Sequence, residues 1–197
     1  AFQECASLEQ ITIDPHKTTV ESTAFKNCIS LQKMIIDTDN QELNIIDMKP
    51  YPYITTVIIP DNVTIIKDSA FKGCSFLKQI IIPSSVTKIG DFAFDECTSL
   101  EEIDIPNSLS YIGEATFKKC KSLKKITIPD SITVINEKAF YECSCLKEIT
   151  IPQSTTKILI SAFSECFSLE KVIILAPLTS FSERTFYYCS SLKEIII

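Results

Sequence analysis

The sequence repeats a 23-residue unit from end to end, and this period constrains the fold more than any other feature. The clearest copy is AFKGCSFLKQIIIPSSVTKIGD, over residues 70–91. Its opening Ala-Phe pair, or a Thr-Phe variant, recurs at residues 1–2, 24–25, 93–94, 116–117, 139–140, 162–163 and 185–186. The copy at 47–48 has lost the pair, but no copy has gained or lost a residue. A period of this length predicts a solenoid in which each copy forms one coil.

The apolar positions of the unit predict which side chains face the core. In residues 70–77 the apolar side chains are spaced by one, four and seven, which predicts a short helix. Residues 80–82 alternate as a strand, which Pro83 ends because proline cannot donate to a strand ladder. Val86 and Ile89 are expected to face inward from a second short extended segment. Stacked coils should turn each inward position into a buried column. One such column is Ile13, Ile36, Ile59, Ile82, Ile105, Ile128, Ile151, Ile174 and Ile197.

The unbroken period predicts a single elongated domain over residues 1–197, with about eight and a half repeats. Both ends fall within a repeat and lack the polar cap that a solenoid needs, so we expect a segment of a longer protein. The net charge is −6, and no basic patch suits nucleic acid. No apolar run approaches the roughly 20 residues of a membrane span. We therefore expect neither nucleic-acid binding nor direct membrane insertion in this segment.

Eight of the nine cysteines share one repeat position: Cys5, Cys28, Cys74, Cys97, Cys120, Cys143, Cys166 and Cys189. Because free cysteine is a small hydrophobe, the position favours a buried column of inert thiols, with disulfides between neighbouring coils as the alternative. No CxxC pair accompanies the single histidine, His16, so zinc is not expected. Cys145 replaces a serine found in other repeats, and we expect it to be the most reactive thiol, although neutral drift from serine also explains it.

Residues 47–53, DMKPYPY, break the pattern. Tyr51 stands where cysteine belongs, and two prolines oppose a helix. A degenerate coil that the fold tolerates is the favoured interpretation, and a local contact site formed by Tyr51 and Tyr53 is the alternative. Asn62 begins an Asn-Val-Thr pattern, which predicts glycosylation only if the protein is secreted.

Charged residues recur in two exposed columns. The first column reads Glu102, Lys125, Glu148, Lys171 and Glu194, and the second reads Lys78, Glu101 and Lys124. Charges of opposite sign at every step predict a ladder that fixes the register of the coils, whereas a merely solvated face would show no alternation. Because exposed ion pairs contribute only ~0–1 kcal/mol each, the expected effect is specificity of stacking.

The motif LxxIxIPxSVTxIGxxAFxxC, residues 77–97, resembles the 23-residue leucine-rich repeat of BspA-type proteins, also known from treponemal surface proteins. The resemblance covers essentially the whole chain and fails only at residues 47–53. It implies an α/β fold, a right-handed leucine-rich-repeat solenoid with a parallel sheet on its concave face and short helices or turns on the convex side. It also implies a cell-surface or secreted protein that binds host proteins or other cells.

Residues suited to catalysis are not found in a working arrangement. His16 stands alone in an expected solvated turn, so no triad can form around it. Glu101 and Glu102 are successive strand residues and should face opposite ways, which opposes joint acid–base chemistry. Three glycines cannot build a phosphate-binding loop. We expect a non-enzymatic module without cofactors that binds a protein partner, and an intracellular scaffold or a structural spacer are the alternatives.

The outward face of the predicted sheet offers the best candidate binding site. Its middle column reads Thr12, Ile35, Ile58, Ile81, Asp104, Thr127, Thr150, Ile173 and Ile196. Three adjacent isoleucines should form an apolar strip bordered by Lys33, Thr56 and Gln79. Exposed apolar patches with polar rims often mark contact sites, and the concave sheet is the usual binding surface of a solenoid. The alternatives are strand propensity alone, or self-association through this strip or through the uncapped ends.

Overall fold

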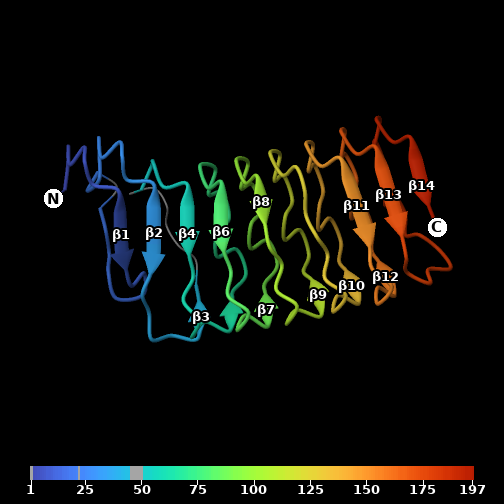
Figure 1. Cartoon of the computed structure of the whole chain (residues 1–197), viewed down its shortest axis with the longest axis horizontal. Helices are drawn as coiled ribbons and strands as arrows, with labels where there is room; N and C mark the ends of the chain where they lie inside the picture. The colour runs from blue at the N-terminus through green and yellow to red at the C-terminus, as the bar shows by residue number, and fades with distance from the viewer. Residues whose placement is uncertain (1, 22, 45–50) are drawn as a thin grey trace.

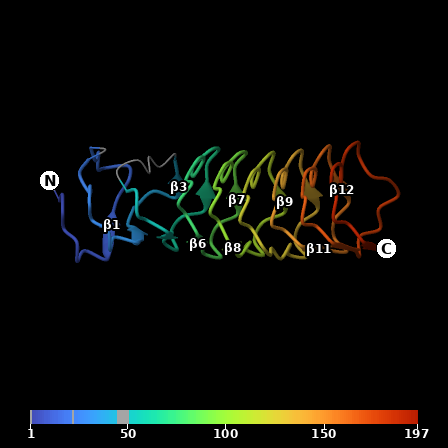
Figure 2. The ribbon, with the colours of Figure 1, turned by 90° about the horizontal axis from the view of Figure 1, so that it is seen from above.

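The computed structural model describes residues 2–21, 23–44 and 51–197, which form a parallel β-solenoid of about eight turns (Figure 1). The two termini lie at opposite ends of the solenoid. Two rows of strands run along it on different sides, as the two perpendicular views show (Figures 1 and 2). The predicted solenoid is therefore confirmed.

The longer strands form the main sheet, the name used here for the row that contains β1. Its first five strands are paired in the order β1 (Gln10–Ile13), β2 (Lys33–Ile36), β4 (Thr56–Ile58), β6 (Gln79–Ile81) and β8 (Glu102–Ile103). Its last three are β11 (Glu148–Ile151), β13 (Lys171–Ile174) and β14 (Glu194–Ile196). Asp104 and Thr127 form an isolated parallel bridge at the interruption between these two parts. Every pairing is parallel and joins equivalent positions of neighbouring repeats, as the period predicts.

The second row consists of two-residue strands. They are β3 (Glu42–Leu43), β5 (Ile65–Ile66), β7 (Lys88–Ile89), β9 (Tyr111–Ile112), β10 (Val134–Ile135) and β12 (Lys157–Ile158). The first three pair with one another, and so do the last three. In β7, Ile89 is buried and Lys88 is exposed, and Val86 just before it is also buried. The predicted second extended segment is confirmed.

The short helices predicted at segments such as 70–77 are wrong, since the described residues form no helix. Two positions of the repeat have a positive φ, both of them in every coil from Ser69 onward, and a right-handed helix cannot contain such residues. The first set spans 48–59° at Ser69, Phe92, Ala115, Lys138, Ser161 and Arg184. The second spans 56–74° at Glu4, Asn27, Gly73, Glu96, Lys119, Glu142, Glu165 and Tyr188. In this part of each coil, backbone N–H groups point toward the next coil. Phe71 and Gly73, for example, donate to the carbonyls of Ala93 and Asp95 at 2.8 and 2.7 Å. The segment satisfies its backbone between coils, so it needs no helix.

A ladder of phenylalanine rings occupies the core beside these turns. The rings of Phe71, Phe94, Phe117, Phe140, Phe163 and Phe186 stack with neighbouring centroids 5.1–5.6 Å apart and planes within 2–14° of parallel. Tyr51 is only 5% exposed, and its ring lies 5.4 Å from that of Phe25. Tyr51 therefore belongs to the core, and the interpretation of Tyr51 as part of a contact site is wrong. Residues 47–50 of the irregular segment lie outside the described residues.

The predicted isoleucine column is buried through most of its length, from Ile13 to Ile174. Two members depart from the prediction. Ile82 is half-buried, and Ile197 is 84% exposed because no later coil in this chain covers it. The stacked columns form one continuous hydrophobic cluster, which is expected to supply most of the stability of a solenoid.

The cysteine column has a specific bonding role. All nine cysteines are free; Cys28, Cys74, Cys97, Cys120, Cys143 and Cys166 are buried. In the column the thiol donates to the phenylalanine carbonyl of the preceding coil, as Cys120 does to Phe94 at 3.3 Å. The same carbonyl accepts the N–H of Cys97 at 3.1 Å. Cys5 is exposed, so its predicted burial is wrong: no preceding coil in this chain covers it.

We predict that the free energy of unfolding falls as the pH rises above about 9. Burial raises the pKa of Cys120, Cys143 and Cys166 above the ordinary value of 9.0. In alkali the unfolded chain loses thiol protons that the folded chain keeps, so stability is complete below pH 9 and is lost above it. Each thiol should contribute about 1.4 kcal/mol per pH unit. Urea unfolding at several pH values from 8 to 10 would give the slope of the free energy of unfolding against pH. Cys143→Ala should reduce this slope by about this amount, and Cys145→Ser should leave it unchanged. An equal slope in wild type and Cys143→Ala would contradict the prediction.

We also predict that iodoacetamide modifies Cys145 and Cys5 first in the native protein. Both residues are exposed, whereas the six buried thiols are shielded from the reagent. Mass spectrometry of timed samples should show rapid modification at these two positions and slower modification of Cys189, which is half-buried. Early modification of Cys97 or Cys120 would show that the column is open to solvent.

Candidate functional site

The outward face of the main sheet carries the predicted apolar strip. Met34, Val57 and Ile80 point into the core and are 0–3% exposed. The residues that follow them, Ile35, Ile58 and Ile81, therefore lie on the outward side, because successive strand residues point to opposite sides; Ile35 and Ile58 are half-buried there. The three isoleucines are register partners across β2, β4 and β6, and Ile81 is 47% exposed. These three residues are called the isoleucine strip below.

The predicted border of the strip is also brought together. Lys33, Thr56 and Gln79 are register partners two positions before the strip on the same strands. The side-chain amide of Gln79 donates to the carboxylate of Glu102 at 3.1 Å, so it links the border to the next strand. The six candidate residues thus form one continuous surface on three strands, with Lys33 as its only charged member.

Beyond Glu102 the same face carries many charges, but the predicted charge ladder forms only in part. Within the described residues, its first column contains one ion pair, between Lys171 and Glu194 at 3.0 Å. The pair between Lys124 and Glu101, at 2.7 Å, confirms one step of the second column. The step through Lys125 is wrong: its segment forms only the Asp104–Thr127 bridge and pairs with neither β8 nor β11 as a strand.

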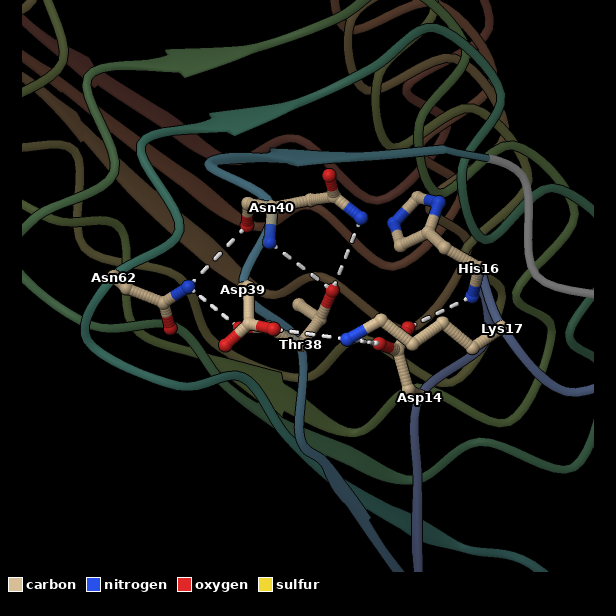
Figure 3. Close-up of polar contacts among 7 residues, drawn as sticks. All are labelled: Asp14, His16, Lys17, Thr38, Asp39, Asn40 and Asn62. Carbon is tan, nitrogen blue, oxygen red and sulfur yellow. Dashed lines mark hydrogen bonds and ion pairs between the residues drawn. The ribbon is translucent and has the colours of Figure 1, made fainter.

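A polar cluster lies just after the carboxyl ends of β1 and β2 (Figure 3). The ammonium group of Lys17 lies 3.2 Å from Asp14 Oδ2 and 2.8 Å from Asp39 Oδ2. The backbone N–H of His16 donates to Asp14 Oδ1 at 2.9 Å. Burial works to raise the pKa of Asp14, but the hydrogen bonds from His16 and Lys17 outweigh it and lower that pKa. Hydrogen bonds to Asp39 and Asp14 raise the pKa of Lys17.

Backbone-directed hydrogen bonds hold the loop after β2 in place. The amide of Asn62 donates to the carbonyl of Thr38 at 2.6 Å, and the N–H of Asn40 donates to the Thr38 hydroxyl at 3.2 Å (Figure 3). His16 is half-buried beside this loop, with Nδ1 3.4 Å from the side-chain nitrogen of Asn44. The expectation of a solvated His16 is therefore wrong. Glycosylation of Asn62 stays an untested possibility of the sequence.

A cavity of about 210 Å³ opens within this cluster. It is lined by Thr12, Ile13, Asp14, Lys17, Asp37 and Asp39. The sequence reasoning missed it, although a signal was present: Asp14 and Asp37 replace the proline that follows the strand in later repeats. Three carboxylates face one ammonium group, so the cavity is acidic.

The described residues contain no group of three histidine, cysteine or acidic side chains placed to hold a metal ion. Nor do they form a helix with the length and apolar character needed to cross a bilayer.

Comparison with known proteins identifies relatives over the whole chain. The family model described as "BspA type Leucine rich repeat region" matches in six copies, over residues 1–49, 49–135 and 111–197. A search of curated proteins finds no similar sequence. Among solved structures, a leucine-rich repeat protein of T. pallidum is 26% identical with a TM-score of 0.71, and the match covers 81% of this chain and 77% of that one.

Two other solved structures extend this likeness. A leucine-rich cell surface protein of Faecalibacterium prausnitzii A2-165 is 29% identical with a TM-score of 0.55; the match covers 89% of this chain and half of that one. The pneumococcal vaccine antigen PcpA is 22% identical with a TM-score of 0.56, over 96% of this chain and 60% of that one, and shows the shared fold alone. The chain thus spans only part of the length of these relatives.

We predict opposite outcomes for lysine at two successive positions of β4. Ile58→Lys should fold with a stability within about 1 kcal/mol of wild type, because its side chain is on the outward face and only half-buried, so a lysine can extend its ammonium group into solvent. Val57→Lys should lose more than ~4 kcal/mol, because the same charge would enter a core position that is 0% exposed. Circular dichroism with urea unfolding would measure both. Unfolding of Ile58→Lys would show that the inside and outside faces are assigned the wrong way round.

Proposed function

The chain belongs to the BspA-type leucine-rich repeat family, and we propose that it is a non-enzymatic protein-binding module for cell-surface adhesion or recognition. The isoleucine strip is the observation that carries this proposal. Three isoleucines occupy outward positions where the next three repeats carry Asp104, Thr127 and Thr150. No core function requires large aliphatic side chains there.

The contrast between the two halves of the main sheet supports binding at the first half. At the strip and its border, Lys33 is the only charge that a partner would have to desolvate. In the second half a partner would cover Glu102, Asp104, Lys125 and Glu148, and burying such charges is costly unless each is matched. An apolar centre with a polar rim is the arrangement of a protein interface.

A location at the cell surface is supported by one relative of similar sequence. The F. prausnitzii protein, 29% identical to this chain, is described as a leucine-rich cell surface protein. We infer the same location for this chain, with a host or cell-surface protein as the partner. The partner and the location are both proposals that rest on family membership and on the exposed strip.

An intracellular scaffold is the second candidate function, and the cysteines favour it. All nine thiols are free, and thiols persist most readily in reducing compartments. Burial of six of these thiols explains equally well why they are free, because a buried column excludes oxidants as well as solvent. In either compartment the proposed binding face is the same.

We predict that Ile58→Lys weakens adhesion and that the matched substitution Thr127→Lys does not. Both residues hold the middle outward column, so each variant adds one exposed lysine to the same face. Beads coated with each variant would be counted on cultured epithelial cells and on immobilised matrix proteins. Loss of a central apolar anchor should weaken binding about tenfold or more. Equal adhesion of wild type and Ile58→Lys would refute the assignment.

The same variants test whether the strip instead mediates self-association. Sedimentation velocity over a range of concentrations would detect self-association. A dimer that Ile58→Lys abolishes, together with unchanged adhesion, would assign the strip to contacts between copies of the chain.

A further inference from the structure

The isoleucine strip continues directly into the acidic cavity. Thr12, which lines the cavity, is the register partner of Ile35. Asp37 lies two residues beyond Ile35 on the same outward side, about 7 Å along the chain. The strip runs across the strands, so a partner that follows it from Ile81 to Ile35 next reaches Thr12 and the cavity that Thr12 lines.

The charge of the cavity is not balanced from within. Lys17 bonds both Asp14 and Asp39 and is the only cation that lines the cavity. Among the described residues, no lysine, arginine or histidine forms an ion pair with Asp37. Asp39 is bound through one carboxylate oxygen and its side chain is 94% exposed. The cavity thus presents one unmatched carboxylate and a second that is open to solvent.

The fold itself does not require these carboxylates. In the following repeats the position of Asp14 and Asp37 is held by Pro60, Pro83 and Pro106, and these repeats still pair in parallel through β4, β6 and β8, although their strands end one or two residues earlier. Asp37 is exposed, so it supplies no core contact. Asp37 is therefore free to serve recognition, whereas Asp14 is engaged by His16 and Lys17.

We propose, on the basis of the proposed function, that the partner docks an extended segment whose aliphatic side chains cover the isoleucine strip and whose next residue places an arginine or lysine in the cavity. The apolar strip selects the aliphatic side chains, and the unmatched carboxylates select the positive charge. Arginine suits the site best, because its planar guanidinium group can bond two carboxylates at once. The strip and the cavity together make one site for a partner that is apolar and then basic.

Two synthetic peptides would test this specificity. Both contain Leu-Thr-Leu-Thr-Leu, followed by two arginines in one and two glutamates in the other, and fluorescence anisotropy would give their Kd values. The arginine peptide should bind about tenfold more tightly or better, and added salt should reduce this preference. Removal of both open charges in the variant Asp37→Asn, Asp39→Asn should reduce the preference to about threefold or less. The matched control is Asp130→Asn, which removes a carboxylate from an exposed turn in the second half of the solenoid. It should leave the preference for the arginine peptide unchanged.

Each contrary result has a definite meaning. Equal affinity for the two peptides, no binding of either, or an unchanged preference in the Asp37→Asn, Asp39→Asn variant would overturn the inference. So would a Ca²⁺-dependent rise in the unfolding temperature that this variant abolishes, since the cavity would then be a cation site. If these results appear while Ile58→Lys still abolishes bead adhesion, only the charge of the partner is wrong. If Ile58→Lys also leaves adhesion unchanged, the proposed function fails as well.

Discussion

Backbone hydrogen bonds between neighbouring coils are the interaction on which the rest of the structure depends. They join the coils on the main sheet, along the second row and at the turns, where Phe94 donates to Thr116 at 2.9 Å. Bonded on three sides, equivalent residues are forced to stack at about the 4.8 Å spacing of strands. The phenylalanine rings follow at 5.1–5.6 Å, and the cysteine thiols bond the carbonyls beside them. An insertion of one residue would displace every later column, which is why the period is constant.

The same stacking makes neighbouring repeats depend on one another at particular positions. Asp68 Oδ1 accepts the N–H of Asp91 at 3.0 Å, one coil later. A Cβ atom at Gly90 would lie 2.2 Å from that oxygen, so glycine is required at the position that the carboxylate of the preceding repeat contacts. Asp91 and Gly113 repeat the arrangement, with Asp91 accepting the N–H of Glu114 at 2.8 Å. Tyr51 shows the opposite case, in which a large ring replaces a thiol and packs on Phe25.

A solenoid of this kind separates stability from recognition. The inward columns are committed to packing, whereas each outward position of the main sheet meets solvent and can change without disturbing its neighbours. On that face three adjacent repeats use this freedom for the isoleucine strip, and the repeats from Glu102 to Glu148 use it for charged and polar side chains. Because the outward columns run continuously across coils, a few substitutions in adjacent repeats create a patch rather than scattered residues. The isoleucine strip and the acidic cavity are both produced in this way.

The sequence by itself determined the solenoid, the parallel register, the inward columns and the outward isoleucines, because a constant period places equivalent residues on neighbouring strands. It could not exclude the helix at residues 70–77, since the spacing of inward side chains is the same in a helix and in a turn whose N–H groups bond the next coil. Only the tertiary structure decided that, through the paired positive φ values. It also decided that Lys125 stays outside the ladder and that Asp14, Lys17, Asp37 and Asp39 line one open cavity. These features depend on how loops and side chains from separate coils meet, and a one-dimensional period carries no information on such distances.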